Sequence, residues 1–133
     1  MYPKHHFIIS AIISIILFAF TKNITASLIC FSAGFLIDVD HILDYIIIYK
    51  KFNLKKFFRY NWHKDKIYVF LHSWEILIIV LLIFKFNIYT IAFAIGFAQH
   101  LIIDLISYPI RNKPMAYFLV YRILKRFKGL CER

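Results

Sequence analysis

Histidine and carboxylate side chains recur at helical spacing inside stretches of the chain that are otherwise apolar. These residues are His6, Asp38, Asp40, His41, Asp44, His72, His100 and Asp104. Neutral imidazole and carboxylate groups are ligands of zinc, manganese and iron. Several carboxylates that converge at low dielectric repel one another, and a divalent cation removes that conflict. The residue types therefore favour a metal site, and a set of His–Asp hydrogen bonds between helices is the alternative.

The spacing of these residues predicts which helix faces carry them. His100 and Asp104 are four residues apart and share one face of a helix. Gly96 lies on the same stripe and predicts the close approach of another helix. The polar residues of segment 38–44 fall within about half of a helix circumference at ~100° per residue. That half must face the protein interior, because a carboxylate facing lipid is very costly.

The apolar stretches predict the helices that position these side chains. Hydrophobic residues make up 62% of the 133-residue chain, more than a soluble domain of this size can bury. A membrane-crossing helix takes about 20 residues. We therefore expect an all-α integral membrane bundle of about four helices in one domain, 1–133, and a soluble helical protein is the alternative. The predicted helices cover 6–21, 25–49, 67–86 and 88–108, followed by an amphipathic helix over 115–128.

Basic residues predict the orientation of this bundle. Seven of the 17 Lys and Arg residues lie in segment 50–66, and seven more lie in segment 111–133. With four spans, both segments lie on the side of the N-terminus, which the positive-inside rule makes cytoplasmic. We expect a multi-pass inner (cytoplasmic) membrane protein whose basic segments contact anionic lipid rather than nucleic acid. On this topology the His and Asp residues of all four helices lie at a similar depth near the cytoplasmic surface.

Two further features bear on processing and redox chemistry. Lys4 and the apolar run after it are similar to a signal peptide, but no small-x-small cleavage site follows Phe20, so we expect a retained helix. Nothing in the positions of the two cysteines, Cys30 and Cys131, suggests a disulfide framework. Cys30 is expected to be a small core residue.

Four sequence elements occur in an order that suggests a family. His6 precedes an apolar stretch, and a Gly and apolar run over 34–41 ends in Asp-x-Asp-His. A His-Ser pair follows at 72–73, and a Gly-x-x-x-His-x-x-x-Asp stripe covers 96–104. Over about residues 5–108 the chain resembles the YdjM-type membrane-bound metal-dependent hydrolases. These are in turn similar to the all-helical zinc-dependent phospholipase C and single-strand-specific zinc nucleases.

The resemblance implies a metal-dependent hydrolase of a phosphoester, such as a lipid headgroup, at the cytoplasmic membrane face. It implies one or two divalent ions, most simply zinc, and an anionic or phosphate-containing substrate. The implied ligands are His6, Asp38 or Asp40, His72, His100 and Asp104. The chain departs from the family at Ile37, where a Pro is usual, and at 66–71, which lacks the family's His-Arg-Gly element.

The hypothesis of a metal-dependent hydrolase also assigns roles within the site. Asp104 would bridge the first ion to a second ion held by His6. Asp38 or Asp40 would complete the first ion's ligands or act as general base, and His41 would orient water or protonate the leaving group. Two other functions stay open: a non-catalytic metal-binding or cation-transport protein, and a redox module with haem held by paired histidines.

Overall fold

The computed structural model describes residues 3–54, 57, 68–107 and 113–127. Its elements are α1 (Pro3–Thr21), α2 (Ile24–Phe35), the 3-10 helix η1 (Leu36–Val39), α3 (Asp40–Tyr49), α5 (Trp74–Phe84), α6 (Ile88–Ser107), α7 (Lys113–Ala116) and α8 (Leu119–Leu124). No strand occurs among these described residues. The predicted all-α fold is therefore confirmed.

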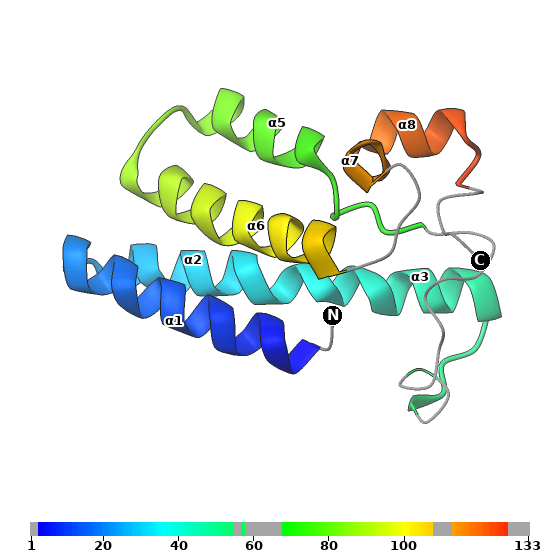
Figure 1. The fold of residues 1–133 in the computed structure, drawn as a ribbon, viewed down its shortest axis with the longest axis horizontal. Coiled ribbons are helices and arrows are strands. Elements are labelled where there is room, and N and C mark those ends of the chain that lie inside the picture. The colour runs from blue at the N-terminus through cyan, green and yellow to red at the C-terminus, as the bar shows by residue number, and fades with distance from the viewer. Residues whose placement is uncertain (1–2, 55–56, 58–67, 108–112, 128–133) are drawn as a thin grey trace.

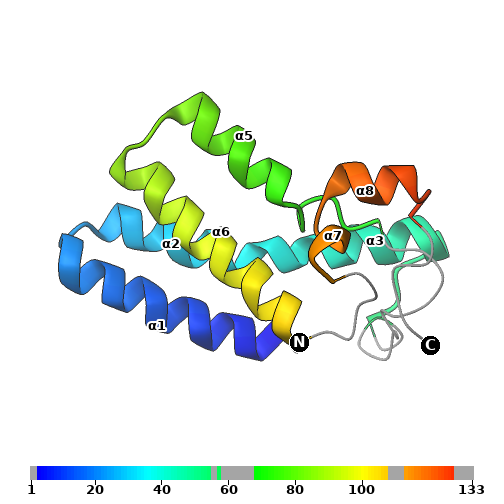
Figure 2. The same ribbon diagram turned by 45° about the horizontal axis from the view of Figure 1, so that its top comes forward.

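Within the described ranges, three segments are long and apolar enough to cross a membrane, and they are Lys4–Thr21, Ile24–Tyr49 and Ile88–Ser107. The helices α1, α2 and α6 pack together, and α5 packs against α6 (Figures 1 and 2). Large apolar side chains point outward, with Phe20 83% and Leu82 75% exposed, while His6, His100 and Asp40 are fully buried. Polar residues inside and apolar residues outside fit a protein whose outer surface faces lipid.

Small residues let α2 and α6 cross closely. A Cβ atom at Gly96 would overlap the backbone carbonyl of Cys30. Cys30, Ala26 and Ala92 are completely buried around this contact. The predicted close approach at Gly96 and the core position of Cys30 are both confirmed. The crossing also brings His100, one turn after Gly96, against the backbone of α2.

The elements α2, η1 and α3 form one rod of 26 residues, Ile24–Tyr49. At 1.5 Å per residue the rod is about 39 Å long, which exceeds the ~30 Å hydrocarbon layer of a bilayer. In Figure 1, α3 extends past the start of α1 and the end of α6. The tighter 3-10 winding of η1 falls on Asp38, and such turns inside helices often mark functional sites. The rod therefore carries Asp38 near one end of the bundle.

The helix predicted over 67–86 is wrong at its start, because α5 begins only at Trp74. The backbone N–H of Tyr68 donates to Asp44 Oδ1 at 2.6 Å, and that of Leu71 donates to Asp40 Oδ2 at 2.5 Å. Backbone groups bound to side chains of another element are not available for helical pairing. His72 therefore precedes α5 instead of lying one to two turns inside it. With 11 residues, α5 is about 17 Å long.

The single amphipathic helix predicted over 115–128 is not observed, and α7 and α8 stand in its place. Phe118 between them is extended, with φ −103° and ψ 123°. The Tyr117 carbonyl accepts the Trp74 N–H at 3.0 Å, which ties this break to the start of α5. Arg122, which lies in the segment predicted to form the amphipathic surface helix, is buried. Most of the basic segment 50–66, His63 included, lies outside the described residues.

Candidate metal centre

The crossing of α2 and α6 fixes the ring of His100. Its Nδ1 lies 2.8 Å from the carbonyl oxygen of Gly34. Because a carbonyl only accepts, Nδ1 carries the proton and Nε2 of the neutral ring carries the free lone pair. Asp104, one turn later on α6, places its Oδ2 3.4 Å from this Nε2. The i,i+4 pair thus presents two ligand atoms to one point, as its spacing predicted.

His72 reaches the same point from the non-helical segment 68–73. Its Nδ1 lies 3.5 Å from Asp40 Oδ2, the oxygen that also accepts the Leu71 N–H. Its Nε2 faces His100, and the two Nε2 atoms are 3.2 Å apart. Asp40 therefore lies behind His72, where an outer carboxylate orients a metal-binding imidazole. Asp38, from η1, is the carboxylate of this rod that faces the ligand atoms.

Two carboxylate oxygens, Asp104 Oδ2 and Asp38 Oδ1, each lie near both His72 Nε2 and His100 Nε2. The five separations that involve a histidine nitrogen are 3.2, 3.4, 3.6, 3.7 and 3.9 Å. Ligands bound at about 2.0–2.1 Å around tetrahedral zinc lie about 3.3–3.4 Å from one another. The observed separations bracket this value, so a divalent ion fits between the two histidine nitrogens and Asp104 Oδ2, with Asp38 Oδ1 near both histidines.

The protonation of the site also fits a cation. Both histidines have an acceptor at Nδ1, so the lone pairs of their Nε2 atoms face each other and two carboxylates. Without a metal ion, the positive charge between these groups would have to come from a second proton on the ring of His72 or His100. Asp38 Oδ2 is buried, and within the part of the chain that the structure describes it has no hydrogen-bond partner. A metal ion would satisfy this donor set without an unpaired buried charge.

His6 approaches the other oxygen of Asp104. Its Nε2 lies 3.0 Å from Asp104 Oδ1, and its ring stacks on His100 with centroids 4.1 Å apart. Among the described residues, the buried Nδ1 of His6 has no hydrogen-bond partner. His6 can therefore orient Asp104 as a hydrogen-bond donor or ligate a second ion that Asp104 bridges.

His41 lies on the more open side of the centre. Its Nε2 is 3.6 Å from Asp38 Oδ1, and the two side chains are 19% and 15% exposed. Its ring centroid is 4.7 Å from that of His72. The side chains of His72, His100 and Asp104 are almost completely buried. The Asp38–His41 pair therefore marks the side from which water or a substrate can reach the centre.

Arg122 is a structural component of the centre that the sequence analysis missed. Its guanidinium donates to the carbonyls of Val69 and His72, the latter at 2.8 Å. Burial lowers the pKa of Arg122, and the negative charge of Asp40 opposes that shift. A further tie joins the Val120 N–H to Glu75 Oε1 at 3.0 Å. The only sequence signal is a cation inside the apolar run 119–124, which also fits a surface helix.

The structure brings together most of the predicted site residues. His6, Asp38, His72, His100 and Asp104 meet at the centre, and Asp40 and His41 flank it. Asp44 lies apart and binds the Tyr68 N–H. Comparisons of the chain with family models, curated proteins and solved structures give no match. The resemblance to YdjM-type hydrolases therefore rests on the sequence motifs alone.

Proposed function

We propose that this protein is a membrane-bound metal-dependent hydrolase that cleaves a phosphoester, such as a lipid headgroup, and uses zinc. The observation that carries the proposal is the convergence of His72, His100 and Asp104, with Asp38 close to both histidines, from three separate elements. The ordered motifs that resemble the YdjM-type hydrolases support the same reaction class.

Different residues of the chain would perform different steps at such a site. A bound divalent ion would polarise a phosphoryl oxygen and lower the pKa of a water molecule. Asp40 and the Gly34 carbonyl hold His72 and His100 with Nε2 turned inward. Asp38, more exposed than the other carboxylate at the centre, can accept a proton from water.

His41 would then move that proton. Its Nε2 is near enough to Asp38 for a short rearrangement to close the 3.6 Å gap to a hydrogen bond. A protonated His41 can donate to the oxygen of a departing alcohol. His6, bound to Asp104 on the buried side, keeps that carboxylate in place or holds a second ion.

We place this site at the cytoplasmic face of the inner membrane. The starts of α1 and α5 and the ends of α3 and α6 lie toward one end of the bundle, and the turns at Lys22 and Lys85 lie toward the other (Figures 1 and 2). The basic segments 50–66 and 111–133 adjoin the first end in sequence. The positive-inside rule gives cytoplasmic termini when α5, although shorter than the hydrocarbon layer at about 17 Å, is the fourth membrane helix and α7–α8 is a surface segment.

The basic segments would also concentrate the substrate. Each basic residue near an anionic membrane surface contributes about 1 kcal/mol to the attraction. Phosphate-bearing headgroups would therefore gather on the side where Asp38 and His41 are exposed.

The spacing of the histidines does not favour a haem centre. Two trans ligands of one iron at about 2.0–2.1 Å would stand roughly 4 Å apart, with the macrocycle between them. The Nε2 atoms of His72 and His100 are 3.2 Å apart, which fits two adjacent ligands of one ion.

The test is turnover of phospholipid and generic phosphodiester substrates by zinc-loaded protein in detergent and in bilayers. We expect hydrolysis that a chelator abolishes and that His100→Ala and Asp38→Asn each lower by at least ~100-fold. Asp44→Asn is the matched control, since Asp44 accepts the Tyr68 N–H and Asn keeps that acceptor oxygen. Bound metal without turnover across the panel would support a cation-binding protein, and a Soret band would support haem.

A further inference from the structure

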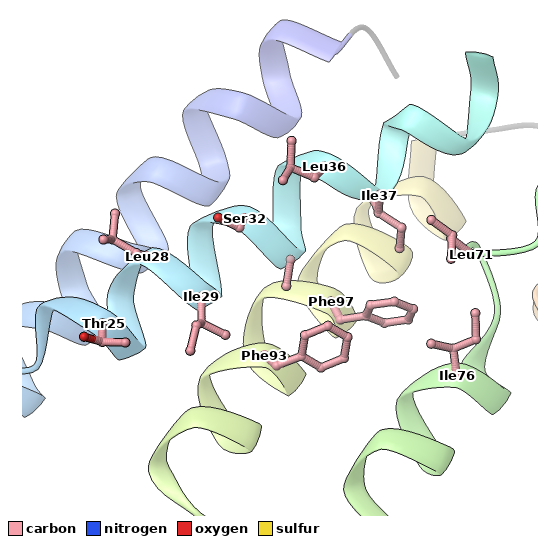
Figure 3. Close-up of a pocket in the computed structure, with 11 residues that line it drawn as sticks. Thr25, Leu28, Ile29, Ser32, Leu36, Ile37, Leu71, Ile76, Phe93 and Phe97 are labelled. Carbon is pink, nitrogen blue, oxygen red and sulfur yellow. The ribbon is translucent and has the colours of Figure 1, made fainter. Parts of the chain in front are cut away.

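An apolar groove runs beside the metal centre on the membrane-facing side of the bundle. It has a volume of about 490 Å³ and lies between α2 and α5, with α6 as its floor. Figure 3 shows the rings of Phe93 and Phe97 between the two outer helices. Leu28 and Leu36 on its rim are more than half exposed, so the groove is open to its surroundings.

One end of the groove is lined by residues that directly precede two of the candidate ligands in the chain. Ile37 and Leu71 line this end, and Figure 3 shows their side chains close to each other. The residues that follow them in the chain are Asp38 and His72, two of the four candidate ligands. At the opposite end the lining reaches Thr25, in the first turn of α2. The groove is thus apolar along its length and meets a polar, metal-binding group at one end.

The dimensions of the groove select its occupant. From Thr25 to Ile37 the rod rises about 18 Å, close to the ~15 Å depth of one bilayer leaflet. Spread over that length, the volume gives a mean cross-section of about 27 Å². A helix about 10–12 Å in diameter has a cross-section of about 80–110 Å², three to four times as large. A single hydrocarbon chain, about 4–5 Å across at carbon–carbon contact distances, fits.

We propose that this groove holds one acyl chain of the lipid whose headgroup reaches the metal centre. The proposal rests on the proposed function and narrows its substrate class to phosphoesters that carry an acyl chain. An acyl chain that moves from the bilayer into this groove goes from one apolar environment to another. The transfer itself therefore contributes little binding free energy. The contribution of the groove is to position the headgroup against the ligand atoms.

The direct test uses bilayers of phosphatidylglycerol in which a fraction of the lipid carries a mid-chain diazirine. After illumination, mass spectrometry maps the labelled residues of the full-length protein. We expect labelling concentrated several-fold at Ile29, Phe93, Phe97 and Ile76 over the exposed faces of α1 and α6. Even labelling around the bundle, or a groove occupied by a second copy of the chain, would overturn the proposal.

A second experiment compares the activity of two matched variants. Ala33→Phe fills the groove, whereas Ala19→Phe adds the same bulk to the exposed face of α1. We expect Ala33→Phe to abolish the groove labelling and to lower kcat/KM for a long-chain phospholipid by ~10-fold or more. Hydrolysis of a chain-free phosphodiester should not change. If Ala33→Phe does not fold, Ser32→Phe on the same wall replaces it.

The labelling experiment and the activity experiment together distinguish failure of the lipid-site proposal from failure of the proposed hydrolase function. Groove labelling without turnover of any phosphoester would keep the lipid site and refute the hydrolase. Turnover with even labelling, or equal losses on long-chain and chain-free substrates in Ala33→Phe, would keep the hydrolase and refute the lipid site.

Discussion

His72 Nε2 and His100 Nε2 face each other at 3.2 Å, although one residue precedes α5 and the other lies near the end of α6. Asp40 fixes the first ring and the Gly34 carbonyl fixes the second, each through Nδ1. Two such nitrogens attract a cation and repel each other without one. Metal binding and the folded state should therefore depend on each other.

Asp40→Asn tests whether Asp40 orients the His72 ring without binding the metal itself. The substitution removes a negative charge from the ring's Nδ1 but leaves the four converging ligand atoms. We expect zinc affinity to fall by about 10–100-fold while saturating zinc still binds in full. Competition with a chromogenic chelator measures the affinity. Asp44→Asn, whose carboxylate accepts the Tyr68 N–H, should change it little. Complete loss of metal in Asp40→Asn would instead make Asp40 a ligand.

Arg122→Met tests whether the hydrogen bonds from Arg122 hold segment 68–73 in place. The change leaves the buried carbonyls of Val69 and His72 without their donor, at a cost of about 1–3 kcal/mol each. We expect a lower melting temperature in detergent and weaker zinc binding, because the segment carries His72. Arg126→Met is the matched control, since Arg126 is exposed. Identical melting temperatures for the two variants would show that Arg122 does not support the centre.

Gly96→Ala tests the helix crossing. The added methyl group would overlap the Cys30 carbonyl, a backbone atom that cannot rotate away. We expect a net loss of about 1–3 kcal/mol of stability despite the better helix propensity of Ala, together with lower metal content. Thermal unfolding with and without zinc measures both effects. Ala19→Val, on the exposed face of α1, should change neither. A variant as stable as the wild type would argue against a rigid crossing.

Cysteine labelling tests the topology. Lys22→Cys and Lys51→Cys, each in a chain with Cys30 and Cys131 replaced by Ala, place single thiols after α1 and after α3. The rod between them crosses the bilayer in our proposal, so an impermeant reagent should reach position 51 only from the cytoplasmic side. Position 22 should react only from the other side. Labelling of both positions from one side would contradict the proposed orientation.

Local spacing was sufficient to predict the α6 part of the centre. The i,i+4 pair His100 and Asp104 and the small residue Gly96 fix one face of one helix, and hydropathy fixes the helix. The meeting of His6 with this face followed from helix order and from the basic segments. These relationships depend on periodicity and topology, which the order of residues records directly.

The contribution of segment 68–73 could not be predicted in the same way. Its apolar residues continue into α5 without a break in composition, so hydropathy extends the helix too far. What prevents helix formation is a set of bonds to Asp40, Asp44 and Arg122, which lie far away in sequence. Such long-range pairings leave no local pattern, and they also decide that Asp38, not Asp40, faces the other ligands.

The most direct test of the central claim is the metal content of detergent-purified protein, measured for wild type, His100→Ala and His63→Ala. His63 belongs to the basic segment 50–66 and is not one of the proposed ligands. We expect about one equivalent of zinc or more in the wild type and in His63→Ala, and almost none in His100→Ala. The melting temperature of the wild type should fall on chelation to that of His100→Ala, because metal binding is coupled to folding. Equal metal content in wild type and His100→Ala would contradict the proposed centre.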